Sequence, residues 1–232
     1  AAMSIIEAKD GTGARYFELA GDNDFMMSNF AMPSETIMGL SNSSLEDNNN
    51  VRLFKNDATT FAMLFSKDRR DQMFAHDTGS NNRYSRWWGE ISNVQGTPNP
   101  YYKKYIQDEG SSSDSDKLNN RWLVPLFRLS EIYLIAMEST TDLNEANSLY
   151  TEYMLARNVQ VENVFSSLEE VQPKAVFEMR IEFMAEGQMF FTYKRTGATD
   201  MFFDYKVVTE ENYIVPIPDS ELKMATENED NK

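Results

Sequence analysis

The stretch that decides the fold runs from residue 126 to residue 138 and reads Leu-Phe-Arg-Leu-Ser-Glu-Ile-Tyr-Leu-Ile-Ala-Met-Glu. From Leu129 onward its apolar side chains recur three and four positions apart, which predicts an amphipathic helix. A capping-box-like start follows at Asp142-Leu143-Asn144-Glu145, with Asp in the usual Ser or Thr position. The apolar stripe then continues to Met154. We therefore expect two antiparallel helices with a short connection.

A third helix is predicted further along the chain. Ser167-Leu168-Glu169-Glu170 reads as a full capping box, and the apolar pattern after it stops at Gly187, a natural residue to follow a helix. Near its end, the carboxylates of Glu182 and Glu186 lie four residues apart and would repel each other without a nearby cation. Arg128 or Arg195 is a plausible bridge, and we expect these charges, with Arg180, to be structural.

Outside these helices the pattern is weaker. Residues 1–6 read as the tail of an amphipathic helix, and residues 59–75 read as a further helix. Residues 77–116 are expected to be mostly loop, and the chain after residue 200 is expected to be extended. Strand signals are few and short, so the prediction is a mainly α protein with long loops.

Composition limits the classes of function. The chain has 232 residues, 22 Lys and Arg against 37 Asp and Glu, a net charge of −15 and 41% hydrophobic residues. This is enough apolar material for one large domain or two small ones. The acidic balance argues against nucleic acid and anionic membrane surfaces as partners. Cysteine is absent, which excludes disulfides, thiolate metal sites and a cysteine nucleophile within this chain.

Candidate catalytic residues are few. Asp77-Thr78-Gly79 matches the tripeptide of aspartic peptidases, but a second such tripeptide is absent and those folds are rich in β-structure. His76 is the single histidine, and no Gly-x-Ser-x-Gly elbow accompanies it. Asp114 and Asp116 alternate as calcium ligands do, but without the Gly and Glu of an EF-hand loop. We expect no enzyme activity, no metal site and no cofactor.

One aromatic segment is the best candidate for ligand binding. Two adjacent indoles in a single loop are not expected to point into one core, so at least one is predicted to face solvent, a partner or another segment. Exposed rings beside amide and guanidinium groups suit a ligand with many hydroxyls, such as a sugar. The alternative, with about equal weight, is that both indoles pack internally. The candidate ligand-binding residues are Asn81, Asn82, Arg83, Tyr84, Trp87 and Trp88.

The last third of the chain resembles the SusD/RagB family of nutrient-binding lipoproteins of Bacteroidetes. Residues 126–138 resemble its "R-x-A-E-x-x-L-x-x-A-E" helix, and residues 178–187 resemble "E-R-x-x-E-L-x-x-E-G". Lys194-Arg195-Thr196-Gly197 fits "L-x-R-x-G", and residues 212–222 fit the closing "Y-x-x-P-I-P-x-x-E". Met189-Phe190-Phe191-Thr192-Tyr193 stands where the family usually has "R-W-x-D-L", and Met179 replaces an arginine.

The resemblance implies a mainly α, SusD-like C-terminal region across residues 1–232, with long loops packed on tetratricopeptide-like helices. It implies a loop-rich part at 20–120, a helical part at 121–195 and an extended tail at 205–232. We expect a fragment, with the family's N-terminal half in the same or another chain.

The implied function is capture of oligosaccharide at the outer-membrane surface and delivery to a TonB-dependent transporter of the SusC type. The lipid anchor would be a cysteine outside this chain. An oligopeptide ligand is the alternative, and a peptidase that uses Asp77 is a remote one.

Overall fold

The computed structural model describes residues 1–26, 31–44, 64–74, 79–92, 98–104, 122–201, 207–216, 218 and 220–221. The chain divides into two compact units, Ala1–Glu182 and Phe183–Lys232. Each unit is described by itself.

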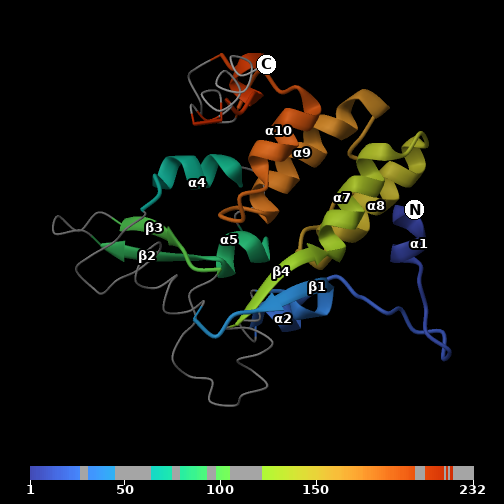
Figure 1. The fold of residues 1–232 in the computed structure, drawn as a ribbon. Helices are drawn as coiled ribbons and strands as arrows, with labels where there is room; N and C mark the ends of the chain where they lie inside the picture. Colours follow the sequence, from blue (N-terminus) through green and yellow to red (C-terminus); the bar gives the residue numbers. More distant parts are fainter. Residues whose placement is uncertain are drawn as a thin grey trace. The chain divides into compact units, whose positions relative to one another are not determined.

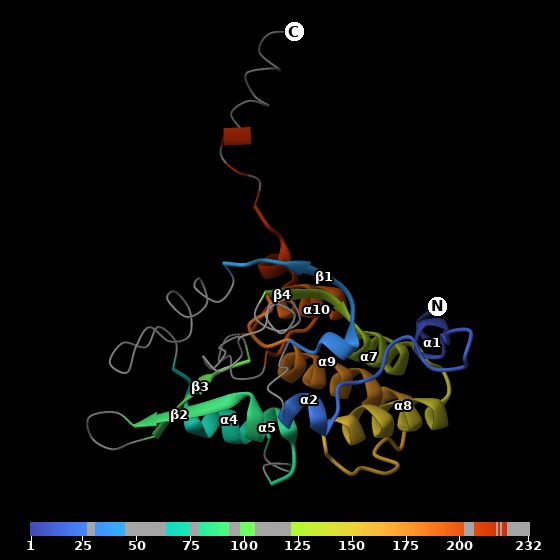
Figure 2. The same ribbon diagram turned by 90° about the horizontal axis from the view of Figure 1, so that it is seen from below.

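The core of the first unit is built around helix α7, Leu129–Ser139. It packs against α8 (Leu143–Ala156), α9 (Val171–Glu182) and the short α1 (Ala2–Ile6), as Figures 1 and 2 show. Seven of the eleven residues of α7 are buried, so apolar side chains cover most of its circumference. The helices expected at residues 1–6, in the 126–138 stretch and after Asp142 are thus present. Residues 126–128 belong instead to the strand that precedes α7.

The Asp142 side chain begins α8 as its pattern predicts. Its Oδ1 accepts the backbone N–H groups of Asn144 at 2.8 Å and Glu145 at 3.5 Å. This satisfies two donors that a helix start leaves without partners. The prediction that the Asp142 side chain begins this helix is therefore confirmed.

Helix α9 differs from its prediction at both ends. The Ser167 hydroxyl makes no cap hydrogen bond; a 3₁₀ turn, η4 (Leu168–Glu170), precedes the helix, and Glu170 accepts the Ser166 N–H at 2.7 Å. The helix ends at Glu182 instead of reaching Gly187. The reason is chemical: the Glu182 carbonyl accepts hydrogen bonds from Lys104 Nζ at 2.8 Å and from Arg128 Nη2 at 3.3 Å. Two cations thus lie at the negative end of the helix dipole.

Two antiparallel pairs of strands are present: three of the strands lie where long loops were expected, and the fourth lies in the part expected to be helical. Strand β1 (Thr36–Ser41) pairs with β4 (Leu123–Arg128), and β2 (Trp88–Ser92) pairs with β3 (Pro98–Tyr102). The prediction of mostly loop over residues 77–116 is therefore wrong for both strands of the second pair.

Short helical segments lie before β1 and between β1 and β2 in the sequence. They are α2 (Asp22–Met26), η1 (Pro33–Glu35), α4 (Lys67–Met73) and α5 (Asn82–Arg86). The helix predicted over 59–75 is present only as α4, since Leu64–Ser66 are not helical and residues 59–63 and 75 lie outside the described part. The Ser66 side chain accepts the Arg69 N–H at the start of α4.

The second unit contains α10 (Met189–Thr196) and the 3₁₀ turn η5 (Glu210–Tyr213). Gly197 ends α10 in the left-handed conformation, with φ of 62°. The Tyr213 hydroxyl donates to the Ala198 carbonyl at 2.5 Å, which joins the two segments. The tail was expected to be extended from residue 205; Glu210–Tyr213 departs from this, while 214–216 have no helix or strand. Within the described residues, every helix is too short or too polar to cross a membrane.

Candidate functional site

Several charged side chains of the first unit gather inside the protein rather than on its surface. We define the charge cluster as seven residues, each with a relative exposure of 2% or less: Glu35, Arg83, Lys104, Arg128, Arg157, Glu178 and Glu182. They come from η1, α5, β4, α9, the residue after α8 and the residues after β3. Buried charges are tolerated only when they are paired and hydrogen-bonded, so the partners of each one decide what the cluster does.

Glu182 lies at the centre of the charge cluster. Its Oε1 accepts from Arg157 Nη2 at 3.0 Å and from Arg128 Nη1 at 3.4 Å, and its Oε2 accepts from Arg157 Nε at 3.2 Å. The Tyr153 hydroxyl also donates to Oε2, at 2.9 Å. Burial opposes ionisation, but the surrounding cations, led by Arg157, outweigh it and hold the pKa of Glu182 below its usual range.

Glu178 is paired in the same way one helical turn earlier. Arg83 Nη1 donates to its Oε2 at 2.7 Å, and the Tyr150 hydroxyl donates to its Oε1 at 3.0 Å. Lys174 Nζ lies 3.2 Å from the same Oε1. Burial raises the pKa of Glu178, but Arg83 and Lys174 lower it by more, so the carboxyl stays ionised. The Arg83–Glu178 pair therefore fastens α5 to α9.

The Arg157–Glu35 pair fastens the segment that precedes β1. Arg157 Nη2 donates to Glu35 Oε1 at 2.7 Å, and its Nη1 donates to the Ala20 carbonyl at 2.9 Å. The Ala20 N–H donates in turn to Glu35 Oε1 at 2.8 Å. One guanidinium group thus holds Ala20, η1 and α9 together.

The charge cluster is a structural joint, in the sense that its ion pairs hold together segments that are distant in the sequence. Burial and the neighbouring Glu178 raise the pKa of Tyr150, and burial is also the main cause of the raised pKa of Tyr153, so both phenols remain donors. The two α9 carboxylates remain acceptors because their pKa values are lowered. The pKa values of these four groups are thus all shifted away from neutral pH, whereas a general acid or base needs a pKa near it. The part of the chain that the structure describes also has no group of His, Asp or Glu that suits a metal ion.

Sequence reasoning found part of this joint. Arg128 was expected as one of two possible bridges between Glu182 and Glu186, and it pairs with Glu182 at 3.4 Å. The sequence prediction missed Glu35 and Arg157, which lie far from α9 in the sequence, and it gave Arg83 to a ligand. A buried charge whose partner is distant in the sequence leaves no local pattern.

The two indoles of the aromatic segment are both buried. Trp87 has 0% relative exposure and Trp88 has 6%. Trp87 packs near Phe25, with ring centroids 5.7 Å apart, whereas Trp88 meets Phe65 edge-on at 4.9 Å. Both indoles also pack against the Tyr102 ring, with centroids 6.3 Å away for Trp87 and 5.2 Å away for Trp88. The expectation that the two cannot point into one core is therefore wrong, and neither indole faces solvent; the alternative, that both pack internally, describes the structure.

The other four candidates of this segment are also engaged within the chain. Asn81 caps α5, and Asn82 Nδ2 donates to Asp22 at 2.5 Å. Arg83 is buried in the charge cluster. The Tyr84 hydroxyl donates to an Asp71 carboxylate oxygen at 3.0 Å, and the Arg70 guanidinium lies 4.8 Å from its ring centroid. Ligand binding by these six residues stays a prediction, now without an exposed indole to support it.

The catalytic candidates cannot be placed in the same way. His76, Asp77, Asp114 and Asp116 lie outside the described residues, and so does Thr78. Gly79 is described and exposed.

Comparison with known proteins identifies the fold. No protein-family model and no curated protein matches the chain. Among solved structures, the chain matches a SusD superfamily protein from Bacteroides vulgatus ATCC 8482, with a TM-score of 0.68 and 18% sequence identity. The match covers 97% of this chain and 52% of that one, so the chain spans about half the length of its structural relative. The expected mainly helical, SusD-like fold is confirmed.

Proposed function

We propose that this chain is part of a nutrient-binding protein that captures oligosaccharide at the outer-membrane surface and delivers it to a TonB-dependent, SusC-type transporter. The observation that carries the proposal is the fold match, which extends over 97% of the chain. The four SusD-like sequence blocks, in the family's order, are a second and independent support. In this proposal a cysteine outside the chain carries the lipid anchor.

A binding role agrees with the chemistry of the charge cluster. The two glutamates of the α9 motif, Glu178 and Glu182, pair with arginines of the same chain and have lowered pKa values. Both carboxylates are therefore engaged in ion pairs within the chain and are not available for catalysis. We infer that the protein does no chemistry on its ligand and acts by binding alone.

Binding to a broad panel of ligands tests the proposal. The purified chain is labelled and applied to an array of plant, fungal and host oligosaccharides, with a pool of oligopeptides printed on the same surface. We expect retention on a subset of the oligosaccharides. Retention on peptides alone would replace the carbohydrate ligand with the oligopeptide alternative, and retention on neither would overturn the proposed binding function.

The array also tests the remote peptidase alternative. Peptides released from their spots in a time-dependent manner would indicate hydrolysis, and an Asp77→Asn variant would then lose it. We expect no release by either form of the protein.

A further inference from the structure

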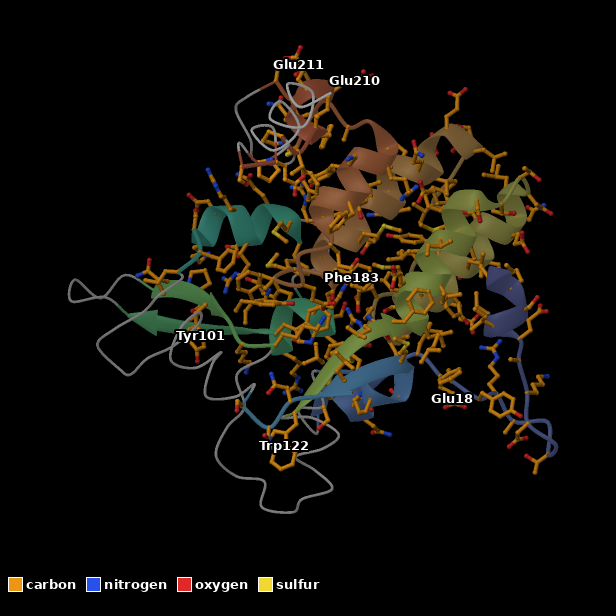
Figure 3. All side chains as sticks on the ribbon, viewed as in Figure 1. Glu18, Tyr101, Trp122, Phe183, Glu210 and Glu211 are labelled. Atoms are coloured by element: carbon orange, nitrogen blue, oxygen red, sulfur yellow. The ribbon has the colours of Figure 1, made fainter. Side chains whose placement is uncertain are left out.

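The β1–β4 ribbon has an outer edge at which backbone groups of β1 point away from the partner strand. Just beyond the ends of the two strands, the Asn42 N–H donates to the Trp122 carbonyl at 2.7 Å; Figure 3 marks Trp122. In an antiparallel pair, hydrogen-bonded positions alternate with positions that are not bonded. Register shifts fall between Thr36 and Gly39, and the pairing is regular from Gly39 to Ser41. Gly39 and Ser41 are therefore at non-bonded positions, and their N–H and C=O groups face the outer edge.

These outward backbone groups are open to water. Gly39 and Ser41 are both exposed, and because glycine has no side chain, the exposure of Gly39 is that of its backbone. Within the described part of the chain, β4 is the single strand paired with β1, and no backbone hydrogen bond to Gly39 or Ser41 comes from elsewhere. The edge therefore offers donors and acceptors at strand spacing to a further strand.

The edge of β1 also lacks the devices that usually protect a free strand edge, which are proline and charged side chains. Each of the other three described strands has one: Glu90 in β2, Pro98 and Pro100 in β3, and Pro125 in β4. Pro125 lies opposite Gly39, so it removes a donor from the outer edge of β4. Strand β1, Thr-Ile-Met-Gly-Leu-Ser, has neither proline nor charge. Among the described strands, β1 is thus the one with an unprotected edge.

The chemistry of this edge specifies the class of partner. A row of backbone donors and acceptors is matched by the edge of another strand, which is how extended segments add to sheets. The side chains of Met38 and Leu40, 59% and 56% exposed, flank the row and favour apolar side chains on the incoming strand. The chain has a net charge of −15, which attracts a basic segment and repels an acidic one, including a second copy of this chain.

We propose that the outer edge of β1 binds an extended, basic and partly apolar segment of another protein, which adds to the ribbon as a third strand. Backbone hydrogen bonds to Gly39 and Ser41 hold the segment, and Met38 and Leu40 contact its side chains. This inference does not depend on the proposed function, because it concerns backbone pairing with a polypeptide and not the capture of a sugar.

The probe is a fluorescent peptide of alternating valine and threonine with a lysine at each end, acetylated and amidated so that it resembles an internal segment of a protein. Fluorescence anisotropy should show that this peptide binds the full chain. The same peptide with methylated backbone nitrogens lacks the donors, and should bind at least about tenfold more weakly. A version with glutamate in place of each lysine has the unfavourable charge and should also bind more weakly.

Variants of β1 locate the site. Ser41→Pro removes one outward donor, leaves the pairing with β4, and should weaken peptide binding by about three- to tenfold. Ser41→Ala keeps that donor and is the matched control, with affinity unchanged. Leu40→Ser should also weaken binding, whereas Leu155→Ser, at a similar exposure of 59% on α8, should not.

The proposal is overturned if the parent does not bind the peptide, if the methylated peptide binds equally well, or if folded Ser41→Pro keeps its affinity. If Ser41→Pro does not fold, as circular dichroism would show, the methylated peptide and Leu40→Ser decide the matter. Binding only of a peptide with free termini would assign the edge to a free oligopeptide. A dimer of the peptide-free chain in sedimentation, lost in Leu40→Ser, would assign it to a second copy, and either result would refute the proposed partner.

Discussion

Replacing Arg157 with methionine tests the structural joint at its most connected residue. The guanidinium donates to both oxygens of Glu182, to Glu35 and to the Ala20 carbonyl, at 2.7–3.2 Å. Methionine fills a similar volume but supplies no charge and no donor. It removes the Arg157 ion pair of Glu35, and it leaves Glu182 with weaker contacts to Arg128 and Arg83, at 3.4 and 3.7 Å.

The expected cost is about 3–5 kcal/mol, which is the range for removing one member of a buried ion pair. That is a large share of the roughly 5–15 kcal/mol by which most domains are stable. The matched control is Arg15→Met, because Arg15 pairs with Glu152 at 2.6 Å with both side chains about 40% exposed. An exposed pair contributes below about 1 kcal/mol.

Urea unfolding followed by far-ultraviolet circular dichroism measures both variants. The midpoint should fall much further for Arg157→Met than for Arg15→Met, with similar slopes. The additional substitution Glu35→Gln should cost less in the Arg157→Met background than in the parent, since the pair is already broken. Equal losses for the buried and the exposed arginine would refute the argument that the charge cluster joins these elements.

Three further expectations concern stability. The pKa values of Glu178 and Glu182 are lowered in the folded state, so their contribution to the free energy of unfolding should be fully present above the unfolded pKa of about 4.3. It should be lost progressively as the pH falls below that value toward the folded pKa. Urea midpoints measured from pH 7 to 3 test this. Asp142→Ala removes the α8 cap and should cost about 0.5–2 kcal/mol in the same assay, whereas no loss would mean that the cap is dispensable. Trp87→Ala should cost about 3–5 kcal/mol because the indole is buried, and an unchanged melting temperature would restore the exposed-platform hypothesis.

The sequence was most informative where the deciding interactions are local. Helix α7 and helix α8 follow from apolar spacing and from the Asp142 cap, all within about 30 residues of chain. The same reasoning found α9, but the predicted Ser167 cap is absent and a 3₁₀ turn precedes the helix. The end of α9 was also misplaced, because a lysine and an arginine from elsewhere in the chain occupy the Glu182 carbonyl.

The β2–β3 ribbon was missed for a physical reason. Its strands contain Gly89, Pro98 and Pro100, residue types that usually argue against strands. Contacts between the paired strands stabilise the ribbon despite this low strand propensity, because the Tyr101 ring covers Gly89. A pattern read along one segment does not contain this contact between strands.

The burial of the two indoles also depends on contacts between segments. Trp87 and Trp88 stand where the chain changes from α5 to β2, and both rings pack against Tyr102 of the neighbouring strand β3. Arg83, next to an amide pair, resembled a ligand-binding arginine. Its partner, Glu178, is 95 residues away in the sequence.

The buried arginines can be observed directly by nitrogen-15 nuclear magnetic resonance of the guanidinium Nε–H groups. Arg157 Nε donates to Glu182 at 3.2 Å and Arg83 Nε donates to Asn81 at 3.2 Å, both inside the protein. Their protons should exchange with water far more slowly than that of the exposed Arg15, and two protected signals should persist at a pH where the Arg15 signal is lost. Exchange of all three at similar rates would show that the arginines reach solvent and that the charge cluster is not the joint described here.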